Sequence, residues 1–261
     1  MTTTAITACF DELRKHPKST QTPRAIDSLE TSLGNDETSG NPNHVREHGS
    51  ILAGREKMAL VWMAQHLPQW VNSDHLTVLG FASMLVAGIA YAEAHRHPWA
   101  LIFVIFALGL NWFGDSLDGT LARVRNQLRP RYGFYVDHVL DMVGTFFLLG
   151  GLALSGYMNP LLALGMLAAY LTAAAEEFLA THVWRVFHLS FLGVGPTELR
   201  IILAIGTLYI LYNPWVHLGS LGVFRLFDVG GLVAIAGLAL KLVISAVRNT
   251  HALYMEERLP R

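Results

Sequence analysis

The stretch from Asp115 to Asp141 decides the fold and reads DSLDGTLARVRNQLRPRYGFYVDHVLD. It follows the pattern D-x2-D-G-x2-A-R-x9-G-x3-D-x3-D, and its four aspartates fall within predicted hydrophobic helices. A carboxylate at membrane depth costs free energy, so an intramembrane aspartate is a functional-site candidate by default. Four of them at helical spacing predict a polar site inside a bundle of membrane-spanning helices.

The spacing places the aspartates on two helix faces. Residues three, four or seven positions apart share one face of an α-helix. Asp115 and Asp118 therefore share a face of one helix, and Asp137 and Asp141 share a face of the next. A short turn between the two helices would let the carboxylates face each other. The other motif residues on these faces are small and leave room for a bulky ligand: Gly119, Ala122 and Gly133.

Carboxylates held this close together predict a cation. Without one, they would repel each other strongly at low dielectric. Ligand sets made only of oxygen favour Mg²⁺, Mn²⁺ or Ca²⁺ over zinc or copper. Mg²⁺ commonly binds a few carboxylates together with substrate phosphates, and paired metals can clamp both oxygens of an in-line phosphoryl displacement. The residues by themselves therefore indicate a binding site for hard divalent cations.

With every fixed position present, the stretch resembles the signature of the CDP-alcohol phosphotransferase family, integral membrane enzymes of phospholipid synthesis. The resemblance implies a reaction in which an alcohol hydroxyl attacks the β-phosphorus of a CDP-linked donor and CMP leaves. It implies a pair of Mg²⁺ or Mn²⁺ ions as cofactor. Members of the family are often homodimeric, which makes a second copy of the chain a candidate partner.

The resemblance also implies roles for single positions. Asp141 is the expected general base and also a metal contact. The expected metal ligands beside it are Asp115, Asp118 and Asp137. The expected contacts to the CDP-linked donor are Asp118, Gly119, Ala122, Arg123 and Gly133. Arginine suits a phosphate contact because its charge is fixed and its donors are bidentate; the alternative for Arg123 is an anchor at the membrane surface.

Composition divides the chain into three parts. The protein has 261 residues, of which 52% are hydrophobic, and a mean hydropathy of +0.37, as expected for a polytopic membrane protein. A net charge of −1 gives no indication of nucleic-acid binding. We expect residues 1–50 to be a polar, disordered cytoplasmic tail. Residues 51–71 predict an amphipathic juxtamembrane helix at the interface; the alternative is a soluble helix packed on the bundle end. Residues 72–261 predict a six-helix transmembrane catalytic domain.

The predicted fold class is all-α, a six-transmembrane-helix bundle with an N-terminal interfacial amphipathic helix. Each predicted span is near the roughly 20 residues that a bilayer requires. The connection between the second and third spans is the most basic, so the positive-inside rule places it, both termini and the aspartates on the cytoplasmic side. The spans are His75–Ala94, Trp99–Arg123, Tyr132–Tyr157, Leu161–Phe187, Thr197–Trp215 and Phe227–Val247.

Residues on the fourth and fifth spans are candidates for binding the acceptor alcohol. Glu176 and Glu177 lie in the fourth span, where the alternative is a buried pair with His182 or Arg185. Arg200 begins the fifth span, where it could contact the acceptor's phosphate or a lipid phosphate, or anchor the helix end.

Three functional readings remain open. The preferred donor is CDP-diacylglycerol with a small polar alcohol as acceptor. The second is a CDP-choline or CDP-ethanolamine donor with diacylglycerol as acceptor, because the signature is common to both branches. The third, of another class, is a divalent-cation transporter. A transporter would require the aspartates but not the glycine, alanine and arginine positions of the motif, so the transferase is favoured.

Overall fold

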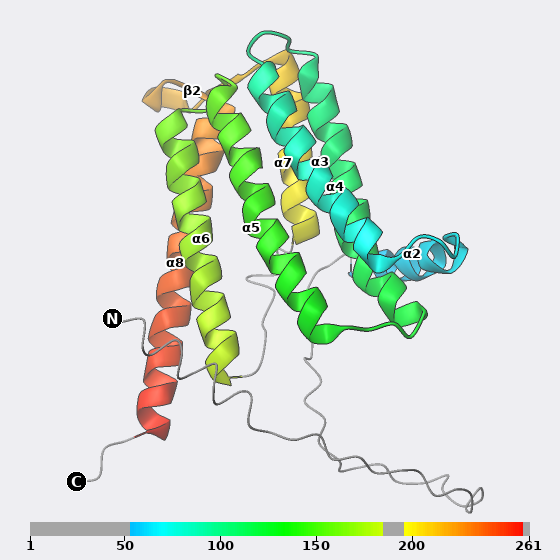
Figure 1. The fold of residues 1–261 in the computed structure, drawn as a ribbon. Coiled ribbons are helices and arrows are strands. Elements are labelled where there is room, and N and C mark those ends of the chain that lie inside the picture. The colour runs from blue at the N-terminus through cyan, green and yellow to red at the C-terminus, as the bar shows by residue number, and fades with distance from the viewer. Residues whose placement is uncertain (1–52, 185–195, 258–261) are drawn as a thin grey trace, which may run out of the picture. The chain divides into compact units, whose positions relative to one another are not determined.

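The computed structural model describes residues 53–184 and 196–257 as a helical bundle (Figure 1). The predicted tail at residues 1–50 lies outside the described residues, and the domain boundaries stay predictions. The elements are α2 (Ala53–His66), α3 (Ser73–Glu93), α4 (Ala100–Val124), α5 (Pro130–Leu154), α6 (Pro160–Trp184), α7 (Pro196–Tyr212), β1 (Trp215–His217), β2 (Val223–Arg225) and α8 (Leu226–Glu256).

Five of the described helices, α3, α4, α5, α6 and α8, are long and apolar enough to cross a membrane. They confirm the predicted all-α, polytopic fold class, and the protein is an integral membrane protein. Large apolar side chains such as Phe103, Phe106 and Val233 are exposed on the outer surface, as a lipid-facing surface requires. Helix α7 is apolar but has 17 residues, so the count of six spans stays a prediction.

Helices α3, α4 and α5 form the tightest part of the bundle because glycines let their backbones approach. A Cβ at Gly88 of α3 would collide with the backbone of Phe147 on α5, and one at Gly151 would collide with Gly88. A Cβ at Gly114 of α4 would lie 2.7 Å from the backbone nitrogen of Gly80 on α3. Small residues at helix contacts are the usual device for close packing in membranes. Gly114 immediately precedes Asp115, so this contact sets how the motif faces α3.

The largest apolar core lies toward the end of the bundle away from the motif. It includes the buried Leu101 and Val104 of α4 and Leu152 of α5. A hydrogen bond of 2.6 Å joins the buried hydroxyls of Tyr91 on α3 and Thr207 on α7. Buried polar groups are normally paired in this way, and the pair attaches α7 to the bundle.

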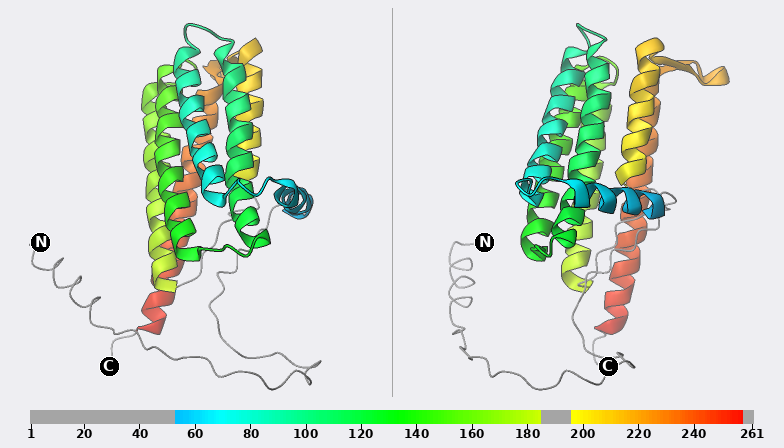
Figure 2. Two further views of the ribbon diagram at one scale, coloured as in Figure 1. Left: turned by 45° about the vertical axis from the view of Figure 1, so that its right-hand side comes forward. Right: turned by 90° about the vertical axis from the view of Figure 1, so that its right-hand side faces the viewer.

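Helix α2 lies across the bundle rather than along it (Figure 2). Leu60 and Ala64 of α2 pack against buried leucines of α4. The Arg125 guanidinium at the end of α4 donates to backbone oxygens of the α2–α3 connection, at 3.0 Å to Leu67 and 2.5 Å to Val71. α2 is therefore fastened to the helix that carries the motif, and its placement at a membrane interface stays a prediction.

The fifth predicted span, Thr197–Trp215, extends past the observed helix, and this boundary was wrong. Helix α7 ends at Tyr212, and β1 and β2 then form an antiparallel hairpin in which Trp215 pairs with Arg225. Pro214 explains the difference, because a proline lacks the N–H that a helix needs and disfavours helical geometry in the residue before it. The hairpin lies at the end of the bundle opposite the α4–α5 connection (Figures 1 and 2).

Candidate metal and phosphotransfer site

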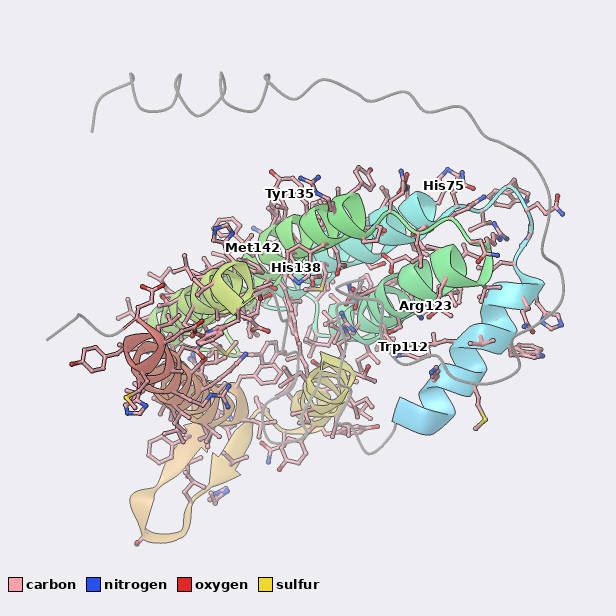
Figure 3. The ribbon with its side chains drawn as sticks, turned by 90° about the horizontal axis from the view of Figure 1, so that it is seen from below. His75, Trp112, Arg123, Tyr135, His138 and Met142 are labelled. Atoms are coloured by element: carbon pink, nitrogen blue, oxygen red, sulfur yellow. The ribbon has the colours of Figure 1, made fainter. Side chains whose placement is uncertain are left out.

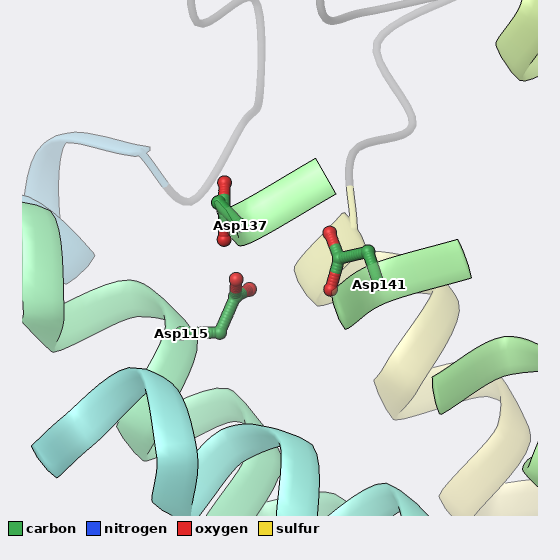
Figure 4. A group of neighbouring side chains, drawn as sticks. All are labelled: Asp115, Asp137 and Asp141. Carbon is green, nitrogen blue, oxygen red and sulfur yellow. The ribbon is translucent and has the colours of Figure 1, made fainter. Parts of the chain in front are cut away.

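Three carboxylates converge between α4 and α5. Asp115 comes from α4, and Asp137 and Asp141 come from successive turns of α5 (Figure 4). One oxygen of each lies within 4.8 Å of the others, and all three residues are half-buried. The helices reach this arrangement because the chain turns sharply at the α4–α5 connection, where Asn126 has a left-handed φ of 54°. Together the oxygens could hold a divalent cation.

Asp118 lines the same pocket but is directed toward α3. Its Oδ2 accepts a hydrogen bond of 2.7 Å from the Thr77 hydroxyl. Its backbone oxygen accepts one of 3.0 Å from the Ser73 hydroxyl. The four predicted aspartates therefore share one pocket, with three in a close group and the fourth oriented by α3. The pocket is lined by Thr77, Gly80, Phe81, Met84, Asn111, Asp115, Asp118, Asp137, Leu140 and Asp141.

The other predicted donor contacts occupy different surroundings. A Cβ at Gly119 or Gly133 would meet no atom within 4 Å, so there is open space beside both. Ala122 is buried, with 8% of its surface exposed. Arg123 is exposed near the end of α4, at the end of the bundle viewed in Figure 3. On α5 the same view shows His138, whose ring packs 4.2 Å from the ring centre of Phe134.

Arg200 of α7 contacts the carboxylate group directly. Its Nη2 lies 2.5 Å from Oδ2 of Asp115, and both side chains are largely shielded, at 16% and 22% exposure. The sequence placed Arg200 on the acceptor side of the site. The structure places its guanidinium beside the predicted metal ligands, which brings a fixed positive charge next to the carboxylates.

Glu176 and Glu177 are held by α8 and lie apart from the aspartates' close group. Glu177 pairs with the Lys241 ammonium at 2.9 Å. Glu176 accepts hydrogen bonds from Ser245 at 2.8 Å and Asn249 at 3.0 Å. The sequence suggested His182 or Arg185 as partners; Arg185 lies outside the described residues, and the partners shown here come from α8. These contacts join α6 and α8 within the membrane-spanning part of the bundle.

Tyr170 of α6 lies between these two polar groups. Its hydroxyl lies near the Thr145 side chain of α5 and near the charged groups of Asp141, Glu177 and Arg200. Sequence reasoning did not select Tyr170. A tyrosine in an apolar helix gives no signal by itself, since buried tyrosines commonly serve packing.

Asn111 and Thr77 were also missed as site residues. Asn111 lies one turn before Asp115 on α4, and only 3% of its surface is exposed. Its Nδ2 donates to the Gly80 backbone oxygen at 3.0 Å, whereas its Oδ1 has no hydrogen-bond partner among the described residues. An unpaired buried polar atom costs about 1–3 kcal/mol. A buried oxygen lacking a partner beside a carboxylate group fits a site for a hard cation.

Spacing could have revealed both residues. Asn111 is four positions before Asp115, and Thr77 is four positions after Ser73, so each repeats a polar residue on one helix face. Such repeats are weak signals, because polar residues also pair helices for stability alone.

Two comparisons with known proteins bear on this site. The human protein Cholinephosphotransferase 1 is 26% identical to the chain over 116 residues, which is 42% of this chain and 28% of the human protein. The family model described as CDP-alcohol phosphatidyltransferase matches residues 70–243, from just before α3 into α8. That range includes every aspartate of the pocket and also Arg200. The chain belongs to the CDP-alcohol phosphatidyltransferase family.

Proposed function

We propose that this enzyme transfers a phosphatidyl group from CDP-diacylglycerol to a small polar alcohol that carries a phosphate, releasing CMP. The observation that carries the proposal is the group of Asp115, Asp137 and Asp141, whose oxygens lie within 4.8 Å of one another, with Arg200 held against Asp115. We propose Mg²⁺ or Mn²⁺, as a pair of ions, for the carboxylates.

Each pocket residue has a separate task in this reaction. A bound divalent cation supplies neutralisation of the donor's pyrophosphate charge, which makes CMP a better leaving group. Asp115, Asp118 and Asp137 are the proposed ligands, and Thr77 holds the Asp118 carboxylate in one orientation. Asp141 takes the proton of the acceptor hydroxyl. The acceptor oxygen then forms a bond to the β-phosphorus, and the bond from that phosphorus to the bridging oxygen breaks, so CMP leaves with that oxygen.

The charges around the pocket favour an anionic acceptor. The Arg200 guanidinium provides fixed donors for phosphate oxygens at the aspartates. The two glutamates that could attract a cationic headgroup, Glu176 and Glu177, are engaged with α8. Glycerol phosphate and inositol phosphate are examples of the phosphate-bearing alcohols that these charges favour.

For the donor we propose the contacts that the family signature implies. Open space beside Gly119 and Gly133 supports a nucleotide pocket there. Arg123 is exposed in the last turn of α4, and this exposure supports the proposal that it contacts a donor phosphate entering from the aqueous side. We propose that this side is the cytoplasm, and that both termini face it, because the basic α4–α5 connection lies at this end.

A second candidate is transfer of phosphocholine or phosphoethanolamine from a soluble CDP-alcohol to diacylglycerol. The human relative, whose name denotes a cholinephosphotransferase, supports this candidate. The match spans 28% of that protein's length. We rank this candidate second because the Arg200 guanidinium beside the carboxylates favours an acceptor that carries a phosphate, and diacylglycerol carries none.

A CMP-release assay on the purified full chain separates the candidates. CDP-diacylglycerol is supplied with glycerol phosphate, inositol phosphate or serine in one set, and CDP-choline or CDP-ethanolamine with diacylglycerol in the other. Mass spectrometry identifies the lipid product. We expect release in the first set, with phosphate-bearing acceptors preferred. Release only in the second set would replace the proposal by the second candidate, and no release together with cation flux in liposomes would indicate a transporter.

A further inference from the structure

The buried amide of Asn111 lines the same pocket as the four aspartates, and one of its polar atoms has no hydrogen-bond partner among the described residues. Asn111 lines the pocket one helical turn from Asp115, on the same face of α4. It lies farther than the aspartates from the end of α4 that carries the basic connection. It is therefore the polar residue at the inner, membrane side of the pocket, where the other lining groups include Phe81 and Met84.

The orientation of this amide is determined by its neighbour. The Nδ2 atom is 3.0 Å from the Gly80 backbone oxygen on α3, and only a nitrogen can donate to that oxygen. Reversing the amide would bring two acceptors together. The Oδ1 atom is consequently the group left over, and it has no partner in the part of the chain that the structure describes.

Few ligands suit an acceptor in this position. A neutral carbonyl oxygen next to carboxylates is a hard ligand for a divalent cation, or accepts a hydrogen bond from a water bound to that cation. Mg²⁺ and Mn²⁺ keep several waters when carboxylates bind them, and residues that hold such waters tune the affinity of the site. An apolar ligand would leave Oδ1 unpaired, so the lipid tail of a substrate does not account for it.

We propose that Asn111 is a further member of the cation site, with Oδ1 binding the cation or one of its waters from the membrane side. This proposal rests on the proposed function, because it requires the aspartates to hold a divalent cation. It assigns two tasks to one side chain. The Nδ2 donor joins α4 to α3, and the Oδ1 acceptor completes the oxygen ligands of the cation.

Mn²⁺ binding to the purified full chain tests the proposal without any turnover. Free Mn²⁺ is measured by electron paramagnetic resonance during titration in detergent, without substrate. Asn111→Leu keeps the branched shape and the number of side-chain heavy atoms but removes both polar atoms, and we expect its Mn²⁺ affinity to fall about 10- to 100-fold, as is typical for residues that support a metal site. Asn111→Asp also loses the donor to Gly80 but keeps an oxygen, so we expect its affinity to match or exceed the wild type.

Two controls separate the possible failures. Thr207→Val removes an equally buried interhelical hydrogen bond, to Tyr91, and should lower the melting temperature without changing Mn²⁺ affinity. Asp115→Asn should weaken Mn²⁺ binding by itself, and if it does not, the proposed cation site is wrong. If Asp115→Asn weakens binding while Asn111→Leu stays within twofold of wild type, only the role of Asn111 is overturned. Should Asn111→Leu fail to fold, a tenfold loss in Asn111→Asp would overturn it as well.

Discussion

The contact between Thr77 and Asp118 can be tested by removing one oxygen atom. Thr77→Val keeps the shape of the side chain and deletes the hydroxyl that lies 2.7 Å from Asp118 Oδ2. The same hydroxyl lies 3.1 Å from the Ser73 backbone oxygen, but it has a single hydrogen. The shorter contact, to a charged acceptor, is the one that we expect to hold that hydrogen.

The size of the effect follows from the kind of bond. A hydrogen bond to a charged group contributes about 1.5–3 kcal/mol, and the pair is half-buried and therefore only partly screened by solvent. Each 1.4 kcal/mol is about tenfold in an equilibrium constant. If the whole of this energy orients Asp118 for cation binding, the Mg²⁺ concentration for half-maximal activity should rise about 10-fold, with roughly 150-fold as the upper limit.

The assay is CMP release from CDP-diacylglycerol over a range of Mg²⁺ concentrations. We expect Thr77→Val to approach wild-type turnover at high Mg²⁺, because the ligand is kept and only its orientation is lost. Thr172→Val is the control, since among the described residues the Thr172 hydroxyl donates within its own helix, at 2.8 Å to Ala168. An unchanged Mg²⁺ requirement in Thr77→Val would show that α3 does not orient the carboxylate.

Four further outcomes are expected. Exhaustive chelation should abolish CMP release, and Mg²⁺ or Mn²⁺ should restore it; full activity without metal would contradict the carboxylate site. Asp141→Asn should lower turnover about 10²- to 10⁴-fold while donor binding largely persists, whereas Asp118→Asn should weaken metal binding itself. Arg200→Ala should raise the acceptor KM more than the donor KM, and Arg123→Ala the reverse; a purely donor-side effect of Arg200→Ala would reverse our assignment. A cysteine replacing Gln127 in a variant without Cys9 should react only from the cytoplasmic side, and labelling from the opposite side would reverse the orientation.

The carboxylate group could be predicted from sequence because its geometry is local. Asp137 and Asp141 share a helix face through spacing alone, and the short connection between α4 and α5 limits how far Asp115 can lie from them. Apolar stretches also predicted the spanning helices, and prolines at the starts of α6 and α7 marked two of their boundaries.

The contacts made from other helices could not be predicted in the same way. Thr77 reaches Asp118 across 41 positions of sequence, and it does so because Gly114 lets α4 lie against α3. Whether a glycine in an apolar helix serves such a contact depends on the neighbour, which a single sequence does not reveal. For the same reason, the partners of Glu176 were sought on its own helix, although they lie on α8.

The ion pair between Arg200 and Asp115 joins the residue proposed to bind the acceptor to a proposed metal ligand. A carboxylate has two oxygens, and Arg200 contacts Oδ2 of Asp115. A carboxylate can accept from a guanidinium with one oxygen and bind a cation with the other, so we expect the two positive charges to share this aspartate. An acceptor phosphate held by the Arg200 guanidinium would keep the acceptor's hydroxyl close to Asp141 and to the β-phosphorus that it is proposed to attack. Because Arg200 stands on α7, which Thr207 also fastens to α3, the position of α7 relative to α4 would determine how closely an acceptor can approach the donor.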